Sequence, residues 1–211
     1  MSSKVSLVWA TPDIENTVAY CARVSNPSNQ ANNETAPKLL KYLMKNKHWS
    51  PFEMANVCME IETTRDIARQ ILRHRSFSFQ EFSQRYAEAT EFAIRECRMQ
   101  DTKNRQNSLV TEDQYLKHWW NAAQLRVQDE AELVYKQALS KGIAKEQARA
   151  LLPEGLTMSK MYMNGTLRSW LHYVEIRCDE ATQKEHREVA NQCKDIIMGL
   201  CPSIKELLNE Q

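Results

Sequence analysis

Residues 54–85 read MANVCMEIETTRDIARQILRHRSFSFQEFSQR, and this stretch decides the fold. Apolar and polar residues alternate from 54 to 62, which predicts a strand with one buried face. From Thr64 onward the apolar residues follow helical spacing instead, and Thr64 is a suitable N-cap for a helix over 65–74. A strand that leads directly into a helix indicates a mixed architecture of strands and helices.

The second part of this stretch, residues 73–85, consists mainly of charged and polar side chains. It holds three arginines, one histidine, one glutamate and three serines in thirteen positions, so few of its residues suit a core. Phe77, Phe79 and Phe82 are expected to anchor an irregular or extended segment. A cluster of arginines around one carboxylate, Glu81, is suited to binding an anion such as phosphate. A solvated basic helix end is the alternative, because runs of charge usually lie on the surface.

Outside this stretch the chain divides into short strands and longer helices. Asp13 and Thr166 are suitable N-caps for two helices, and Thr111 with Gln114 matches a capping box for a third. The expected elements are a strand over 5–10, helices over 14–22, 39–47, 112–141, 144–153, 167–177 and 182–200, a strand over 156–164, polar loops over 25–35 and 100–108, and a turn or short helix from 202. The expected fold class is α+β, with a small antiparallel or mixed sheet and several long helices in a single domain over residues 1–211.

The bulk composition argues against several classes of protein. The formal net charge is +1, with 28 basic and 27 acidic residues, so global charge favours neither nucleic acid nor a membrane as a partner. Four glycines and no GxGxxG or Walker pattern argue against a dinucleotide fold built on a glycine-rich turn. No cysteine or histidine spacing predicts a metal site. The scattered cysteines, with no signal-peptide pattern and no run of ~20 apolar residues, favour a cytoplasmic protein.

A second group of basic residues lies in the C-terminal half of the chain. Arg168, His172 and Glu175 share one helix face by their spacing, whereas Arg177 follows Arg168 by about two and a half turns. With Arg149 these residues form a second candidate anion site, and a solvated helix face is again the alternative. Taken alone, the segment 48–53 reads as an ordinary connection from a helix to a strand.

Residues 73–85 resemble the signature of the flavin-dependent thymidylate synthases, Arg-His-Arg-x-x-Ser-x-Asn-Glu-x-Ser-x-Arg. The chain matches seven of its eight fixed positions, and the departure is Gln80 in place of asparagine. Further segments resemble the family in the same order along the chain, namely 22–25, 48–53, 70–72, 149–153 and 164–177. The resemblance therefore covers nearly the whole chain, and it makes the surface-patch alternatives much weaker at the matching positions.

The resemblance implies an enzyme that converts dUMP to dTMP by reductive methylation. In this family FAD passes on hydride from NADPH, methylenetetrahydrofolate supplies the carbon, and no cysteine nucleophile is obligatory. The resemblance also implies a homotetramer whose active sites combine residues from several subunits. The expected partners are therefore dUMP, folate, NADPH and further copies of the chain, without nucleic acid or membrane.

Residue roles follow from the matching positions. The residues expected at dUMP are Gln70, Ile71, Leu72, Arg73, Glu81, Phe82, Ser83, Gln84, Arg85, Arg149 and Arg177. The residues expected at FAD are Ser50, Arg73, His74, Arg75, Glu81, Thr166, Leu167, Arg168 and His172. Arg177 is the expected catalytic residue, because a guanidinium beside uracil stabilises the N3-deprotonated ring and activates C5. Arg85 and Arg149 are the candidates for the phosphate or base edge, and Ser83 is expected to position the uracil rather than attack it.

Three departures from the family pattern leave other outcomes open. Gln80 adds one methylene inside the signature, and Met54 and Thr166 stand where a second histidine and an asparagine are common. Weaker flavin binding or different redox tuning would follow from them. The nearest alternative is a related enzyme that transfers another one-carbon group, such as hydroxymethyl, to a deoxypyrimidine nucleotide. A nucleic-acid-binding module is the alternative from another class, and the near-neutral charge argues against it.

Overall fold

The computed structural model describes residues 3–89 and 91–209, so both ends of the expected domain over 1–211 lie outside the described residues. Its centre is a four-stranded sheet in the order β1-β2-β6-β3, with antiparallel pairing throughout. The strands are β1 (Lys4–Ala10), β2 (Asn56–Thr64), β6 (Met158–Thr166) and β3 (Ser78–Glu81). The predicted α+β class with a small sheet is confirmed, and the sheet is antiparallel rather than mixed.

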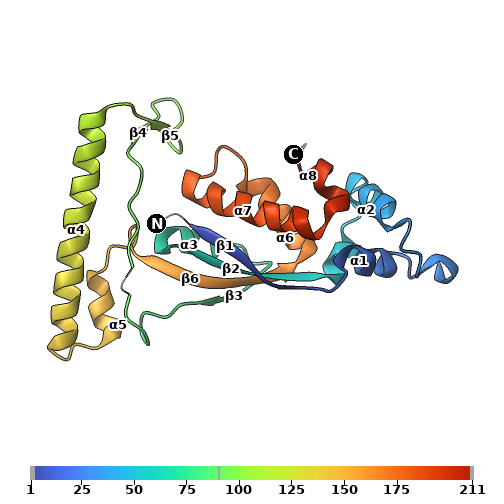
Figure 1. The fold of residues 1–211 in the computed structure, drawn as a ribbon, viewed down its shortest axis with the longest axis horizontal. Helices are drawn as coiled ribbons and strands as arrows, with labels where there is room; N and C mark the ends of the chain where they lie inside the picture. The colour runs from blue at the N-terminus through green and yellow to red at the C-terminus, as the bar shows by residue number, and fades with distance from the viewer. Residues whose placement is uncertain (1–2, 90, 210–211) are drawn as a thin grey trace.

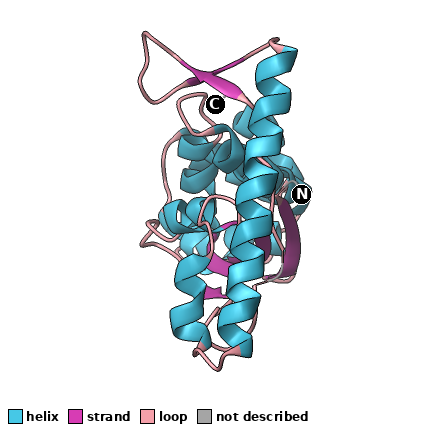
Figure 2. Ribbon diagram, turned by 90° about the vertical axis from the view of Figure 1, so that its left-hand side faces the viewer, coloured by secondary structure: helices cyan, strands magenta, loops and turns pink. Residues whose placement is uncertain are grey.

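Helices cover one face of this sheet and extend past both of its ends (Figure 1). Over the sheet lie α3 (Arg65–Ile71), α6 (Leu167–Arg177) and α7 (Lys184–Leu200). At one end lie α1 (Ile14–Ala22), α2 (Ala36–Lys45) and α8 (Lys205–Asn209). At the other end stand α4 (Gln114–Ser140), α5 (Lys145–Ala148) and a hairpin of β4 (Arg98–Gln100) and β5 (Ser108–Val110), as Figure 2 also shows. Short 3-10 helices complete the chain: η1 (Pro27–Asn29), η2 (Ser50–Met54), η3 (Arg149–Leu151) and η4 (Pro202–Ile204).

The alternation in β2 builds the core. Met59 and Ile61 are fully buried and pair with Met163 and Met161 of β6. These side chains belong to one buried cluster with Trp170 of α6 and with residues of α7. Because burying one such side chain contributes about 1.5–3 kcal/mol, the contact between this sheet face and the helices is the main source of stability.

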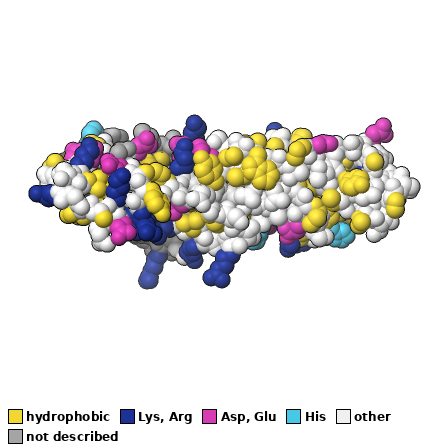
Figure 3. Space-filling model, turned by 90° about the horizontal axis from the view of Figure 1, so that it is seen from below, with side chains coloured by type: hydrophobic (Ala, Val, Ile, Leu, Met, Phe, Trp, Pro, Cys, Tyr) yellow, Lys and Arg dark blue, Asp and Glu magenta, His cyan; other side chains and the backbone are white. Residues whose placement is uncertain are grey.

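The opposite face of the sheet carries polar side chains. Lys160 Nζ on β6 lies 3.2 Å from Glu60 and 2.9 Å from Glu62 on β2. Figure 3 shows this face from below, with most of its basic side chains gathered toward the end that carries α4 and α5. Since exposed ion pairs contribute little to stability, this face is held in place by the core on the other side of the sheet.

Three capping predictions are wrong. Asp13 stands at the start of α1 with a φ of 48°, and its carboxylate accepts from Asn16 Nδ2 instead of a backbone N–H. The Thr64 hydroxyl bonds the Asp66 side chain and caps no backbone group of α3. The capping box at Thr111 is also wrong, because α4 begins after Asp113, whose carboxylate accepts from Leu116 N at 3.0 Å.

Other elements begin or end up to three residues from the expected positions; α3, for example, ends at Ile71 instead of residue 74. Two segments differ in kind from the sequence expectation. The polar loop expected over 100–108 is the turn of the β4–β5 hairpin, in which Asp101 accepts from Lys103 N at 2.8 Å and from Asn107 Nδ2 at 3.0 Å. Strands of three residues are too short to show a period in the sequence. The helix expected over 144–153 is broken into α5 and η3. The irregular or extended segment predicted around Phe77, Phe79 and Phe82 is confirmed, since Phe79 lies in β3 and the other two flank the strand.

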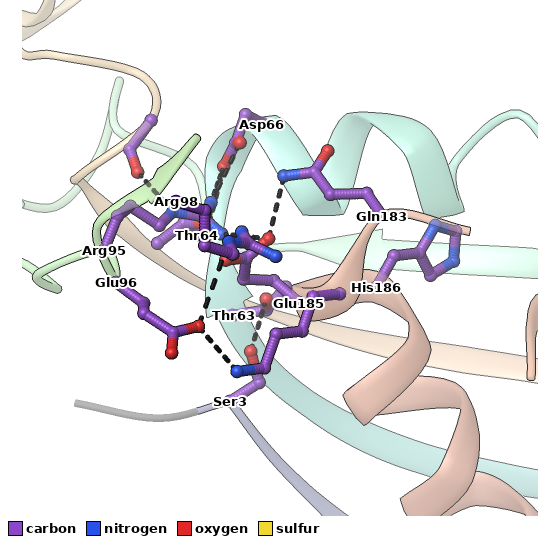
Figure 4. A network of polar contacts seen from close by, with 12 residues as sticks. Ser3, Thr63, Thr64, Asp66, Arg95, Glu96, Arg98, Gln183, Glu185 and His186 are labelled. Carbon is purple, nitrogen blue, oxygen red and sulfur yellow. Dashed lines mark hydrogen bonds and ion pairs between the residues drawn. The ribbon is translucent and has the colours of Figure 1, made fainter. Parts of the chain in front are cut away.

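A network of charged side chains holds the start of α7 against α3 and the segment before β4 (Figure 4). Arg95 Nη1 lies 3.2 Å from Glu185 Oε2, Arg98 binds the other oxygen of Glu185, and Arg95 Nη2 lies 2.6 Å from Asp66. Arg95, Arg98 and Glu185 are each 13% to 15% exposed. Burial alone would raise the pKa of Glu185, but hydrogen bonds from Arg98 and Gln183 lower it to about 2.

The charge on Glu185 is expected to make stability depend on pH in acid. Its folded pKa of about 2 lies below the ordinary value of 4.5, so the ionised carboxylate stabilises the fold above about pH 4.5. This contribution, on the order of 3 kcal/mol, is lost as the pH falls from there toward 2. Urea unfolding of the wild type and Glu185→Gln at pH 7 and pH 3 checks this: the stability gap between them should shrink in acid. A gap that stays constant would contradict the assignment.

Candidate active site

The signature leaves the end of α3 and returns along the sheet as β3. In β3, Phe79 pairs with Met163 and Glu81 with Met161. Phe77, just before the strand, packs edge-on against Trp170 with ring centroids 4.8 Å apart. Gln80 is exposed, so the extra methylene at this departure from the family pattern meets no core packing. The aromatic residues of the signature thus anchor it, and its polar residues lie at the edge of the sheet.

One group of predicted residues borders the start of α6. Arg168 Nη1 lies 2.8 Å from Glu53 Oε1, and the Thr166 hydroxyl donates to Glu53 Oε2 at 2.7 Å. The Thr166 hydroxyl and the Arg168 guanidinium together hold the pKa of Glu53 below its ordinary value. Thr166 also caps α6 by accepting from Ser169 N at 3.2 Å, so the predicted cap is confirmed. An open pocket of about 380 Å³, called here the α6 pocket, is lined by Trp49, Glu53, Ser76, Arg168, Ser169, His172 and Glu175.

A second group lies between α3, α6 and α7. Arg177 Nε donates to His74 Nε2 at 2.9 Å. Burial and the neighbouring charge of Arg177 lower the pKa of His74 to about 4. His74 is therefore neutral near pH 7, with Nε2 as the acceptor, and it orients the Arg177 guanidinium. The ring of His74 also packs edge-on against Tyr173, with centroids 4.9 Å apart. Gln70, His74, Tyr173, Arg177 and His186 form this central group.

A third group lies at the end of the signature, around a pocket of about 400 Å³ that we call the basic pocket. It is lined by Arg65, Arg69, Gln84, Glu146, Arg149, Ala150, Leu152 and Glu154. Gln84 is 3% exposed, and its Nε2 has no hydrogen-bond partner among the described residues. Arg85 Nε lies 3.5 Å from Glu146 at its rim. A buried amide donor in a pocket that is also lined by three guanidinium groups is suited to an anion.

Glu81 connects the signature to β6 and α3. Its Oε1 accepts from the Ser159 hydroxyl at 2.8 Å and lies 3.5 Å from Arg65 Nη1. A carboxylate held in this way keeps its second oxygen available to accept from a ligand.

The structure does not bring all the predicted residues into one pocket. Arg168 and His172 line the α6 pocket, whereas Gln84 and Arg149 line the basic pocket, and the two pockets share no lining residue. Ile71 and Leu167 are fully buried, so their side chains pack in the core, and Leu72 packs against it. The remaining predicted residues are exposed or half-buried: Ser50, Gln70, Arg73, His74, Arg75, Glu81, Phe82, Ser83, Arg85, Thr166 and Arg177.

Several residues of the site carry no local signal in the sequence. Ser159, Tyr173 and His186 contact Glu81, His74 and Gln70 respectively only because the sheet and α7 bring distant segments together. Glu53 could have been singled out, because it closes the family-like segment 48–53 and is the one carboxylate in it.

The described residues also bear on metals and membranes. Within 3–89 and 91–209, no three or more His, Cys, Asp or Glu side chains are grouped so that they could hold a metal ion. No helix in this described part of the chain has the length and apolar character needed to cross a membrane. All six cysteines are free thiols.

Comparisons with known proteins point to one family. The family model described as "Thymidylate synthase complementing protein" matches residues 6–203. The chain is 53% identical over 194 residues to the flavin-dependent thymidylate synthase of Synechocystis sp., covering 92% of this chain and 89% of that protein. It is 50% identical over 196 residues to a probable flavin-dependent thymidylate synthase of Paramecium bursaria Chlorella virus 1, covering 92% and 90%.

The fold is also similar to a solved structure, that of a UMP/dUMP methylase PolB from Streptomyces cacaoi bound with 5-Br dUMP. The TM-score is 0.86 at 27% sequence identity, over 100% of this chain and 96% of that one. The predicted family is confirmed by these relatives. The chain therefore belongs to the flavin-dependent thymidylate synthases.

Proposed function

We propose that this chain converts dUMP to dTMP with the residues of the α6 pocket, the central group and the basic pocket. As a member of its family it is a methylating enzyme that uses FAD. Methylenetetrahydrofolate as carbon donor and NADPH as hydride source are consistent with that family. The observation that carries the proposal is the basic pocket, where the buried amide of Gln84 lies beside Arg65 and Arg149.

The basic pocket and the central group are proposed to hold dUMP. Arg149 and Arg85 offer paired donors to a phosphate, and the Gln84 amide adds a buried one. The side chains proposed to contact dUMP are Gln70, Arg73, Glu81, Phe82, Ser83, Gln84, Arg85, Arg149 and Arg177. Ile71 and Leu72 would contact the nucleotide through their backbones, since their side chains pack in or against the core.

The α6 pocket is proposed to hold part of FAD. Its donors and its apolar wall fit that group, since Arg168 offers a guanidinium, His172 a ring nitrogen and Trp49 an aromatic surface. FAD supplies the hydride that completes the methyl group. The residues proposed to contact it are Ser50, Arg73, His74, Arg75, Glu81, Thr166, Leu167, Arg168 and His172, with Leu167 contributing its backbone.

Arg177 is proposed as the catalytic residue. Neutral His74 orients its guanidinium by accepting from Nε, which leaves its terminal nitrogens to donate to the uracil. A fixed positive charge beside the ring lowers the pKa of N3–H, so the ring anion forms more readily and C5 becomes nucleophilic.

We also propose that the chain, as one domain over 1–211, assembles as a homotetramer in the cytoplasm. α4 extends beyond the sheet (Figure 2) and exposes Tyr115, Trp119, Val127 and Leu133. Large apolar side chains on a protruding helix favour burial against further subunits. Assembly would also bring pockets of different subunits together, and the cytoplasm would keep the six thiols reduced.

Substitution of Arg149 tests the place proposed for the phosphate. Arg149→Ala is expected to weaken dUMP binding to the FAD-loaded protein about 10- to 100-fold, because a charge-assisted hydrogen bond contributes about 1.5–3 kcal/mol. Binding of deoxyuridine, which lacks the phosphate, should not change. Lys38→Ala, an exposed change on α2, is the matched control and should bind dUMP like the wild type.

Isothermal titration with both ligands measures these affinities. An equal loss of affinity for dUMP and for deoxyuridine would contradict the placement of the phosphate in the basic pocket. An oligonucleotide that displaced dUMP would favour the nucleic-acid-binding alternative instead.

A further inference from the structure

The Gln70 carboxamide lies within a chain of hydrogen bonds that the roles above leave unexplained. Gln183 Nε2 donates to Glu185 Oε2 at 3.0 Å, as Figure 4 shows, and Gln183 Oε1 accepts from Gln70 Nε2 at 2.8 Å. Gln70 Oε1 lies 3.2 Å from His186 Nδ1, and His186 Nε2 lies 3.1 Å from the Tyr173 hydroxyl. We call this series, from Glu185 to Tyr173, the Gln70 chain.

The ionised carboxylate at one end determines the direction of every bond. Glu185 can only accept, so Gln183 must turn its N–H toward Glu185 and its oxygen toward Gln70. Gln70 then donates to Gln183 through its nitrogen and turns its oxygen toward His186. His186 therefore carries its proton on Nδ1 and accepts from the Tyr173 hydroxyl at Nε2.

The surroundings of the Gln70 chain support this assignment. Burial, followed by the charge of Arg177, lowers the pKa of His186 to about 3, so its ring is neutral. Burial raises the pKa of Tyr173 well above its ordinary value, so its hydroxyl keeps its proton. The groups that face His186 from the other elements are Gln70 and His74 on the α3 side and Tyr173 and Arg177 on α6.

The side chains at both ends of the Gln70 chain are held in place. His186 and Tyr173 are fully buried, and Arg95 and Arg98 hold Glu185 (Figure 4). Gln70 itself is half-buried and keeps one N–H and one oxygen lone pair for a ligand. Its amide thus presents a donor and an acceptor in one fixed order.

We propose that His186, assisted by Gln183, is a positioning residue that locks the Gln70 carboxamide so that it selects a uracil ring over a cytosine ring. The inference rests on the function proposed above. In the neutral form in which it binds, before N3 is deprotonated, uracil offers an acceptor at O4 and a donor at N3, whereas cytosine offers a donor and an acceptor at these positions. If the Gln70 amide could exchange the positions of its oxygen and nitrogen, it would match the hydrogen-bonding edge of either ring. A Gln70 amide held in one orientation matches the edge of only one ring.

Two substitutions of His186 separate positioning from packing. Asparagine places its amide nitrogen near Nδ1 and can still donate to Gln70, whereas glutamine places its amide near Nε2 and leaves Gln70 Oε1 without this donor. His186→Gln is expected to raise the KM for dUMP about 10-fold, the effect of about 1.4 kcal/mol for one unmade hydrogen bond, with kcat changed less than about 2-fold. Its preference for dUMP over dCMP in binding should fall by a similar factor. His186→Asn should stay within about 3-fold of the wild type in both respects.

Val189→Ala is the matched control, because Val189 is fully buried one turn later on the same helix. It should lose thermal stability and keep the KM and the preference for dUMP. Gln183→Ala, at an exposed position, keeps the fold and should lower the preference for dUMP in the same direction as His186→Gln.

Steady-state kinetics of the FAD-loaded proteins measure the KM for dUMP, and titrations with dUMP and dCMP measure the binding preference. Together they test the proposal. Wild-type values in both His186→Gln and Gln183→Ala would overturn the proposal, and so would equal losses in His186→Asn and His186→Gln. A wild-type protein that forms no dTMP would instead refute the function on which the inference rests.

Discussion

Replacing Arg177 by alanine is expected to lower kcat for dTMP formation about 10²–10³-fold, the usual cost of removing one donor that stabilises developing charge. The variant loses the guanidinium that favours the N3-deprotonated uracil, while the α6 pocket keeps all its lining residues. FAD should therefore bind as in the wild type. Anaerobic steady-state assays measure kcat for dTMP formation, and the flavin spectrum recorded before nucleotide is added shows whether FAD is bound.

The pH dependence of this variant gives a sharper check of the role of Arg177. Since N3 of uracil loses its proton at higher pH without help, the residual activity of Arg177→Ala should rise with pH more steeply than that of the wild type. Arg177→Lys, which keeps a charge without the planar fork, should lie between the two. Normal turnover in Arg177→Ala would refute the catalytic assignment.

Replacing Gly165 by alanine is expected to destabilise the fold by about 1–3 kcal/mol and to lower activity with it. A Cβ at this position would lie 2.6 Å from Cε1 of Phe77 and closer still to its Cδ1. Phe77 has little room to withdraw, because it packs against Trp170 at 4.8 Å and Phe79 at 6.2 Å between ring centroids. The contact therefore pushes on the segment that carries the signature from α3 into β3.

Gly199→Ala is the matched control for this prediction. Gly199 lies inside α7, and an added Cβ would meet no atom within 4 Å apart from its chain neighbours and the nearby helix backbone, so alanine should stabilise the helix by about 0.5–1 kcal/mol. Urea unfolding measures both changes. In a Phe77→Leu background the cost of Gly165→Ala should shrink, since the smaller side chain leaves room for Cβ. Equal stability of Gly165→Ala and the wild type would contradict the packing account.

The elements that could be predicted from the sequence are those in which one periodic face is buried. β2 alternates because Val57, Met59 and Ile61 all enter one core. The caps predicted at Asp13 and Thr64 failed for a local reason, because these side chains found other side-chain partners once the chain was folded. The β4–β5 hairpin could not be predicted, since its turn depends on Asp101 and its strands span three residues each.

The candidate site could likewise be predicted from the sequence only where its residues are contiguous. The signature identified Arg73 to Arg85 and the family, because those residues are contiguous in sequence. It could not show that Arg168 and Arg149 line different pockets, since that depends on where α6 and η3 lie in space. The contact of His186 with Gln70 spans 116 positions in sequence and has no local signal.

The central claim, FAD-dependent methylation of dUMP, is tested most directly by one anaerobic reaction. The purified protein, after dialysis, is mixed with dUMP, methylenetetrahydrofolate and NADPH, while the flavin spectrum is followed and the product mass is determined. The account predicts a protein that stays yellow, a flavin that NADPH bleaches, and dUMP converted to dTMP. A product carrying a hydroxymethyl group would favour the related enzyme, and a colourless protein that forms no dTMP would contradict the account.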